Sequence, residues 1–533
     1  MIPSHRKGKR PIRWTIAEVA EKWLPPSLLD APEEFLQKNP PHKIVKESLI
    51  RAALIISGPK GDLFLKRYKI RGLREGLKYF VAPSKAQTEW VMTRLVLRRG
   101  IPTPLPLAIG ERRERGYLKE AFLISQAISP SLPLIELIHE GGQEGYIFNA
   151  ARLIRRIHEA GIFHKDLHAG NILVQREEGE LYLIDLHRSQ TLRRISERRR
   201  VWNLAQFLYS VKGSLSAEDR EAFLRLYDED GETFKGGIKK AQIKIERSQD
   251  RIHRRHMKSR TKRCLKNSGS FYVAKEGGWR IWSRREWETG ELLEVIEKHK
   301  GIVADRKEGL IKDDRRTALT LFQSTDSRIC IKEYRCKDFG KKLKRLLRGS
   351  KARRGWVNGN GLFVRGIKEI KPLALLDRRR WDFLPEAFLI MDTPSGYIEL
   401  RSYIRENFEH PDSKMAKKGA FLKGLGAFMA KLYNLQIAHR DLKISNILVK
   451  EYDDYWCFGL TDWEDLKLDK EISEKKLIRG LVQMNTSTPL FINLRDRVRF
   501  LKEYLALIGR NDIRGVYREV IRGSEKRGWA NLS

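Results

Sequence analysis

One motif, repeated in the two halves of the chain, constrains the fold more than any other feature. It reads H-x-D-L-x-x-x-N-I-L-V and covers residues 164–174 and 439–449. In both copies an apolar stretch typical of a buried strand follows directly after the asparagine. A chain of 533 residues that carries this motif twice is predicted to contain two large, related units.

Further matches between the halves follow one shared offset. Lys66 and Lys332 stand 266 positions apart, each within an apolar strand, and Trp90 and Trp356 keep the same offset. The offset grows to 275 at the repeated motif. Insertions collect in loops, so a slowly growing offset is what two copies of one fold would show.

The residue types of the repeated motif indicate phosphoryl transfer. In the catalytic loop of kinases an aspartate orients the acceptor hydroxyl, and an asparagine five residues later holds Mg²⁺. The same chemistry requires an upstream lysine on the ATP phosphates and a second metal-binding aspartate downstream. The first half supplies this predicted set: catalytic Asp166, magnesium ligands Asn171 and Asp185, and nucleotide-binding Lys66 and Glu89. The second half supplies catalytic Asp441, magnesium ligands Asn446 and Asp462, and nucleotide-binding Lys332 and Lys443.

Lys66 and Glu89 are predicted to form an ion pair. Lys66 falls in the strand expected over residues 62–68. Ser84 is a helix N-cap signal and Gly100 an end signal, so Glu89 lies in the first two turns of the helix between them. A glutamate there can hold the lysine ammonium toward the nucleotide phosphates. The alternative is that both are unrelated surface residues.

The second half lacks the counterpart of Glu89, because the shared offset puts Gly355 there. Gly359 and Gly361 fall within the same expected helix, and each costs about 1 kcal/mol relative to alanine. That helix is therefore predicted to be weak or shortened. The second unit could be a slow kinase, a kinase that recruits another acid, or an ATP-binding scaffold. Glu464 could contact the acceptor, but a plain loop acid is the favoured interpretation.

The predicted fold class is α+β, with two tandem protein-kinase-like domains. Each is expected to have a small, β-rich N-lobe and a larger helical C-lobe. The predicted boundaries are an N-terminal extension at 1–42, a first domain at 43–238, a basic helical join at 239–266 and a second domain at 267–533. Four cysteines without C-x-x-C spacing indicate neither a disulfide framework nor a zinc site.

A formal net charge of +38 indicates a polyanionic partner. The charge is concentrated at 239–266, where twelve lysines and arginines accompany two acids. Anionic membrane lipid, a phosphorylated glycolipid and nucleic acid all fit this charge, and a merely solvated basic surface is the alternative. No apolar run approaches the length needed to cross a bilayer, and no hydrophobic segment follows the basic N-terminus, so the chain is expected in the cytoplasm.

Residues 184–190 closely resemble the I-D-L-H-R-x-Q signature of bacterial lipopolysaccharide core kinases, the heptose and Kdo kinases. Residues 84–90 and 99–104 are similar to two further segments of that family, A-x-x-E-W and G-I-P-x-P. The resemblance implies ATP- and magnesium-dependent phosphorylation of a sugar hydroxyl in the lipopolysaccharide inner core. It also implies a peripheral position at the inner face of the cytoplasmic membrane. The expected partners are then the lipopolysaccharide core, or another anionic glycolipid, and anionic membrane rather than nucleic acid.

The resemblance covers most of both halves and is sharpest in the first. The first unit is therefore the better catalytic candidate, and the second is either active on another sugar position or regulatory. A protein kinase or another small-molecule phosphotransferase is one alternative, although neither half has G-x-G-x-x-G before its lysine, nor D-F-G or A-P-E after its catalytic loop. A non-catalytic kinase-fold scaffold that binds a polyanion is the other. The complete catalytic set of the first half argues against a scaffold, which would not need it.

Overall fold

The structure, a computed structural model, describes nine stretches of the chain. They are residues 11–48, 51–70, 73–140, 144–323, 328–335, 350–378, 386–410, 415–453 and 455–529. The first ten residues of the predicted N-terminal extension lie outside these stretches. The chain divides into two compact units, Met1–His253 and Arg254–Ser533, which we call unit 1 and unit 2.

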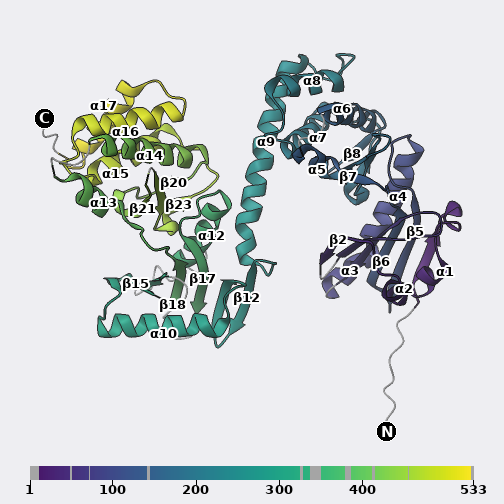
Figure 1. The fold of residues 1–533 in the computed structure, drawn as a ribbon, viewed down its shortest axis with the longest axis horizontal. Coiled ribbons are helices and arrows are strands. Elements are labelled where there is room, and N and C mark those ends of the chain that lie inside the picture. Colours follow the sequence, from purple (N-terminus) through teal and green to yellow (C-terminus); the bar gives the residue numbers. More distant parts are fainter. Residues whose placement is uncertain are drawn as a thin grey trace, which may run out of the picture. The chain divides into compact units, whose positions relative to one another are not determined.

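The N-lobe of unit 1 is a six-stranded antiparallel sheet in the order β1-β5-β6-β4-β3-β2 (Figure 1). Its strands are β1 (Arg13–Ile16), β2 (Lys43–Ser48), β3 (Arg51–Ile56), β4 (Leu63–Lys69), β5 (Pro106–Glu114) and β6 (Tyr117–Gln126). Strand β4 pairs with β3 on one side and β6 on the other. Leu63 and Leu65 therefore face the core, and Lys66 is held in the middle of the sheet.

Part of the predicted N-terminal extension belongs to this lobe. Strand β1 pairs with β5, from Arg13 opposite Glu111 to Ile16 opposite Ala108. The short helices α1 (Pro26–Asp30) and α2 (Pro32–Lys38) follow, and their apolar side chains join the core under the sheet. The first lobe thus begins well before residue 43, because these segments bury apolar surface against it.

Helix α4 (Lys85–Arg98) joins the sheet of unit 1 to its candidate site. The Ser84 hydroxyl caps its N-terminus by accepting a hydrogen bond from the Gln87 amide at 3.0 Å. Ala86, Trp90 and other residues at helical spacing are buried on one face. Gly100, with φ of +71°, follows the last turn. This confirms the helix predicted from its cap and end signals.

The C-lobe of unit 1 is mainly helical. It contains β7 (Ser131–Pro133), α5 (Leu134–His139), α6 (Glu144–Glu159), β8 (Ile162–His164), β9 (Ile172–Gln175), β10 (Leu181–Leu183), β11 (Ser189–Thr191), α7 (Glu197–Ser210) and α8 (Ala217–Tyr227). Between α6 and β8 the chain turns at Gly161, with φ of +67°, where a Cβ atom would lie 2.2 Å from the Leu192 carbonyl oxygen. Only glycine fits there, and the turn delivers the chain into the catalytic loop.

The predicted basic join forms one helix, α9 (Gly237–Thr261), so the division between the units falls within a helix. Its first part contributes Ala241, Ile245 and Ile252 to the core of unit 1. At its end, the Thr261 hydroxyl accepts a hydrogen bond from Arg365 of unit 2 at 3.0 Å.

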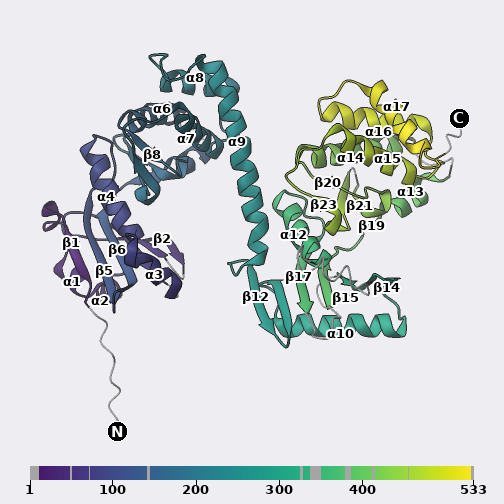
Figure 2. The ribbon, with the colours of Figure 1, turned by 180° about the vertical axis from the view of Figure 1, so that it is seen from behind.

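The N-lobe of unit 2 is a seven-stranded antiparallel sheet in the order β12-β13-β17-β18-β16-β15-β14 (Figure 2). Its strands are β12 (Phe271–Glu276), β13 (Trp279–Arg284), β14 (Leu310–Asp313), β15 (Thr317–Gln323), β16 (Arg328–Tyr334), β17 (Lys371–Arg378) and β18 (Glu386–Asp392). Helix α10 (Thr289–Asp305) lies alongside this sheet and buries Leu292 and Ile296 in its core. Strand β16 carries Lys332 between β15 and β18, as β4 carries Lys66 in unit 1.

Helix α12 (Lys351–Val364) of unit 2 corresponds to α4 and has the same length, 14 residues. The prediction that its glycines would shorten it is therefore wrong. Tertiary packing outweighs the poor helix propensity of Gly355, Gly359 and Gly361, all of which are buried. The remaining helices form the C-lobe: α13 (Leu400–Phe408), α14 (Met415–Asn434), α15 (Glu474–Ser487), α16 (Leu494–Leu507) and α17 (Ile513–Glu525). Each unit thus has a sheet lobe and a helical lobe, and the predicted α+β class is confirmed.

Candidate active site

A buried ion pair connects β4 to α4 in unit 1. The Lys66 Nζ lies 2.5 Å from the Glu89 Oε1, and both residues are almost fully buried, with 6% and 4% of their surface exposed. The Tyr68 hydroxyl donates a hydrogen bond to the other oxygen of Glu89 at 3.1 Å. Burial and the Glu89 charge raise the pKa of Tyr68, so it remains a donor. The predicted ion pair is present, and the lysine is fixed in place.

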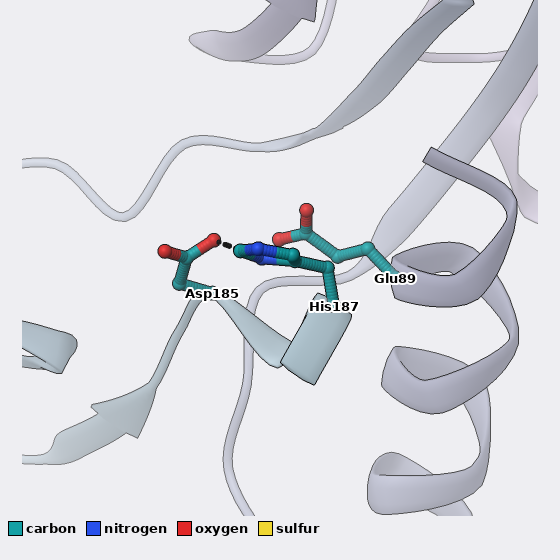
Figure 3. A group of neighbouring side chains, drawn as sticks. All are labelled: Glu89, Asp185 and His187. Atoms are coloured by element: carbon teal, nitrogen blue, oxygen red, sulfur yellow. Dashed lines mark hydrogen bonds and ion pairs between the residues drawn. The ribbon is translucent and has the colours of Figure 1, made fainter. Parts of the chain in front are cut away.

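Asp185 lies directly across from this pair. Its Oδ1 is 3.7 Å from the Lys66 Nζ and also 3.7 Å from a guanidinium nitrogen of Arg51, at the start of β3. His187 points back from the 3₁₀ helix η3 (Leu186–Arg188) and donates a hydrogen bond to the same oxygen at 2.8 Å (Figure 3). Burial alone would raise the pKa of Asp185, but the hydrogen bond from His187 and the Lys66 charge outweigh it and hold this pKa well below its usual value. Asp185 is therefore a carboxylate at neutral pH.

The catalytic loop of unit 1 is braced by its histidine. His164 is fully buried; its Nε2 donates to the Ile184 carbonyl at 3.2 Å, and its Nδ1 accepts from the Asp166 amide, also at 3.2 Å. Burial lowers the pKa of His164 to about 4, so the ring is neutral and suits this pair of roles. The side-chain amide of Asn203, in α7, donates a hydrogen bond to the His164 carbonyl at 2.6 Å and also fixes the loop.

The predicted catalytic residue, Asp166, is held at its backbone and open at its carboxylate. The Asn171 side-chain amide donates to the Asp166 carbonyl at 2.8 Å. The Asp166 side chain is 42% exposed, and its Oδ2 lies 3.1 Å from a guanidinium nitrogen of Arg188. Arg188 is a residue of the I-D-L-H-R-x-Q segment to which the sequence alone gave no role. The structure places Arg188 beside the predicted catalytic aspartate, Asp166, and Arg51 beside Asp185.

The oxygen atoms of this site suit Mg²⁺ bound with ATP. Since Asn171 uses its NH₂ group on the loop backbone, its carbonyl oxygen is the atom left for a cation, and Asp185 offers a carboxylate. Glu89, Asp185 and His187 also bring possible ligand atoms within 4.8 Å of one another (Figure 3). Glu89 is occupied by Lys66, and His187 by Asp185, so a hard cation is better served by Asn171 and Asp185.

The catalytic loop of unit 2 has the same three hydrogen bonds as that of unit 1. The His439 Nε2 lies 3.2 Å from the Thr461 carbonyl, and the Asp441 amide donates to the His439 Nδ1 at 3.2 Å. The Asn446 side chain donates to the Asp441 carbonyl at 2.8 Å. In place of an arginine, Lys443 reaches the Asp441 carboxylate, at 3.0 Å.

In unit 2 the glutamate that contacts the lysine, Lys332, comes from a different element than in unit 1. The Lys332 Nζ lies 2.6 Å from the Asp462 Oδ1 and 2.9 Å from the Glu464 Oε1, and the Tyr334 hydroxyl donates to the Glu464 Oε2 at 3.0 Å. Burial alone would lower the pKa of Lys332, but the charges of Glu464 and Asp462 raise it above its usual value. Burial alone would raise the pKa of Asp462, and Lys332 keeps it lowered. Glu464 is only 7% exposed, so its interpretation as a plain loop acid is wrong.

Comparison with known proteins agrees with this geometry. Residues 62–227 and 309–504, together more than half of the chain, match the lipopolysaccharide kinase (Kdo/WaaP) family. The chain belongs to this family. Membership in the Kdo/WaaP family confirms the resemblance expected from residues 184–190 and makes the protein a kinase by family.

A solved structure titled "WaaP in complex with acyl carrier protein" shares 21% sequence identity with the chain. The match covers 45% of this chain and 99% of the solved one, with a TM-score of 0.33. No curated protein sequence matches the chain. Among the described residues, no helix is both long and apolar enough to cross a membrane.

Proposed function

We propose that unit 1 is an ATP- and magnesium-dependent kinase that phosphorylates a sugar hydroxyl of the lipopolysaccharide inner core. One observation carries the proposal: a fixed lysine, a charged aspartate and an open catalytic aspartate converge at one place. Lys66 lies 3.7 Å from Asp185, and Ile184, directly before Asp185, is hydrogen-bonded to His164 of the catalytic loop. Family membership supports a lipopolysaccharide kinase, and the convergence supports unit 1 as its catalytic part.

Each residue has a separate task in this mechanism. Lys66, held by Glu89, would bind the α- and β-phosphates of ATP. Asp166 would accept a hydrogen bond from the acceptor hydroxyl, orient it toward the γ-phosphate and take its proton as the new bond forms. Asn171 and Asp185 would hold Mg²⁺, which neutralises charge on the transferring phosphoryl group when bound. Arg188 keeps the Asp166 carboxylate in one orientation.

The basic charge of the chain supports an anionic acceptor. A net charge of +38 favours a phosphorylated glycolipid and draws the protein toward anionic lipid at the inner face of the cytoplasmic membrane. The proposed reaction would then take place peripherally on that membrane. Rates of transfer to lipid-presented acceptor should then fall as ionic strength rises, because the attraction is screened by salt.

Mass spectrometry of core oligosaccharide tests the proposal. Purified protein, ATP and Mg²⁺ are incubated with dephosphorylated lipopolysaccharide, and the added phosphate is located on the released core. Asp166→Asn should lower transfer by at least about a hundredfold, as expected for loss of a general base. Asp441→Asn should have a smaller or position-specific effect. Asp30→Asn, at an exposed aspartate of α1, is the control and should transfer normally.

Two outcomes would reject the proposal. Phosphate that appears on protein but never on the core would favour a protein kinase. Equal and complete loss in Asp166→Asn and Asp441→Asn would remove the assignment of catalysis to unit 1.

A further inference from the structure

We infer that unit 2 binds a nucleotide, at the site where Glu464 holds the lysine that a helix glutamate holds in unit 1. The inference goes beyond the proposed transfer reaction and rests on it only for the kind of ligand. It gives a binding site to the unit whose helix acid is missing. It also gives Glu464 a positioning role that no feature of the sequence required.

The contacts around the two lysines are equivalent. In unit 1 Glu89 receives Lys66 at 2.5 Å on one oxygen and the Tyr68 hydroxyl at 3.1 Å on the other. In unit 2 Glu464 receives Lys332 at 2.9 Å and the Tyr334 hydroxyl at 3.0 Å in the same way. The lysine, the tyrosine and a nearly buried carboxylate therefore form the same triangle in both units. The element that carries the carboxylate differs, and so does the distance from the lysine to the next aspartate, which is 3.7 Å in unit 1 and 2.6 Å in unit 2.

The glycines of α12 leave space for the segment that carries Glu464. A Cβ atom on Gly355 would lie 2.9 Å from a Leu389 methyl group and 3.3 Å from the Tyr334 hydroxyl. A Cβ atom on Gly359, one turn later, would lie 2.3 Å from the ring of Trp463. The bare face of the helix thus receives the 3₁₀ helix η6 (Trp463–Asp465), which carries Glu464.

A side chain of α12 also fastens η6 in place. The Asn358 amide donates to the carbonyls of Trp463 at 2.8 Å and Leu466 at 3.1 Å, one at each end of η6. Because both bonds hold the backbone of η6, the position of Glu464 depends on α12, the helix that has Gly355 where α4 has Glu89. The carboxylate that α12 lacks is thus supplied by a segment that α12 itself holds in place.

The groups that would meet a nucleotide are kept. Lys332 lies on the strand between β15 and β18, Asp462 has the same left-handed backbone as Asp185, with φ of 51° and 62°, and Asn446 makes the same loop contact as Asn171. A purely structural salt bridge would need Lys332 and Glu464 but not this loop. The Asp462 side chain is 43% exposed, so it can reach a cation at this site.

Nucleotide binding by the full chain tests the inference. Unit 1 is disabled with Lys66→Ala and Asp185→Asn, and a fluorescent ATP analogue is titrated in the presence of Mg²⁺. One equivalent of analogue should still bind. Adding Glu464→Gln should weaken that binding at least tenfold, and adding Tyr334→Phe should weaken it two- to fivefold. Glu471→Gln, at an exposed acid of the same lobe, is the matched control and should leave it unchanged.

Folding and transfer are followed alongside binding. Thermal unfolding shows whether a variant is folded, and Tyr334→Phe, which removes only a hydroxyl, serves if Glu464→Gln unfolds unit 2. The inference is overturned if the chain with unit 1 disabled binds no analogue, or if both variants bind it like their parent. Transfer to core oligosaccharide is measured separately with unit 1 intact, so the proposed kinase activity can fail or stand independently of this result.

Discussion

The two units agree in the hydrogen bonds of the catalytic loop and differ in the element that supplies an acid to the lysine. The histidine, aspartate and asparagine of the catalytic loop keep the same three hydrogen bonds in both units, at 3.2, 3.2 and 2.8 Å. The acid on the lysine comes from 23 residues downstream in unit 1 and from 132 residues downstream in unit 2. A site of this kind requires a carboxylate at a point in space, and more than one element can supply it.

Replacing the aspartate predicted to bind Mg²⁺, Asp185 in unit 1 and Asp462 in unit 2, should give the largest difference. Asp185→Asn removes the charge beside Lys66 and should lower phosphate transfer about a thousandfold. Asp462→Asn should lower it at most about tenfold if transfer occurs in unit 1. Steady-state rates with saturating ATP measure both. A larger loss in Asp462→Asn would reverse the assigned roles of the units.

Adding one methyl group to the helix of unit 2 tests the close packing of η6. Gly359→Ala puts a Cβ atom against the buried ring of Trp463 and should destabilise unit 2 by about 3 kcal/mol. The counterpart Thr93→Val loses only a hydrogen bond to the Glu89 carbonyl and should destabilise unit 1 by about 1 kcal/mol. Urea unfolding followed by hydrogen exchange of each unit measures both. Stabilisation by Gly359→Ala, as helix propensity alone would favour, would contradict the packing argument.

Low pH should lower the stability of unit 1 because two of its histidines are buried. Burial lowers the pKa of His158 to about 3 and that of His164 to about 4, whereas an unfolded histidine titrates near about 6.5. Between about pH 6.5 and 4 the unfolded chain therefore binds more protons, and stability falls as pH falls, by about 1.4 kcal/mol per pH unit for each histidine. Above that window the full stability is present. Hydrogen exchange of residues 150–210 at several pH values checks the slope, and a rise in stability toward pH 5 would contradict it.

The helix caps should give the smallest effect and no difference between the units. Ser84 accepts from the Gln87 amide and Ser350 from the Arg353 amide, both at 3.0 Å. Alanine at either position should cost about 1 kcal/mol. Thermal unfolding of the two variants measures this. Unequal losses would show that α4 and α12 differ in more than their glycines.

Local signals made much of this structure predictable. The spacing of the repeated motif predicted both catalytic loops, because their contacts span few residues. A cap and a glycine predicted α4, and the position of Glu89 on it predicted the pair with Lys66, which the structure contains. The roles of Asp166, Asn171 and Asp185 in catalysis and metal binding stay predictions, since geometry brings the groups together without testing their chemistry.

Contacts between distant segments were not predictable. Strand β1 is only four residues long and is stabilised by pairing with β5, almost a hundred residues later, so it was assigned to an extension. The fit of Gly359 against Trp463 depends on two segments far apart in sequence, and propensity alone gave the wrong expectation for α12. Glu464 was assigned as a plain loop acid because its contact with Lys332 joins residues 132 positions apart. A carboxylate two residues after Asp462, in a unit that has Gly355 in place of the helix glutamate, is the pattern that could have indicated it.

The bare face of α12 limits how unit 2 can be redesigned. A Cβ atom at position 359 would strike the ring of Trp463, and one at 355 would press on a Leu389 methyl group and the Tyr334 hydroxyl. A glutamate grafted onto the helix at 355 would also compete with Glu464 for Lys332 and Tyr334. Copying the arrangement of unit 1 into unit 2 therefore requires changes in α12 and η6 together.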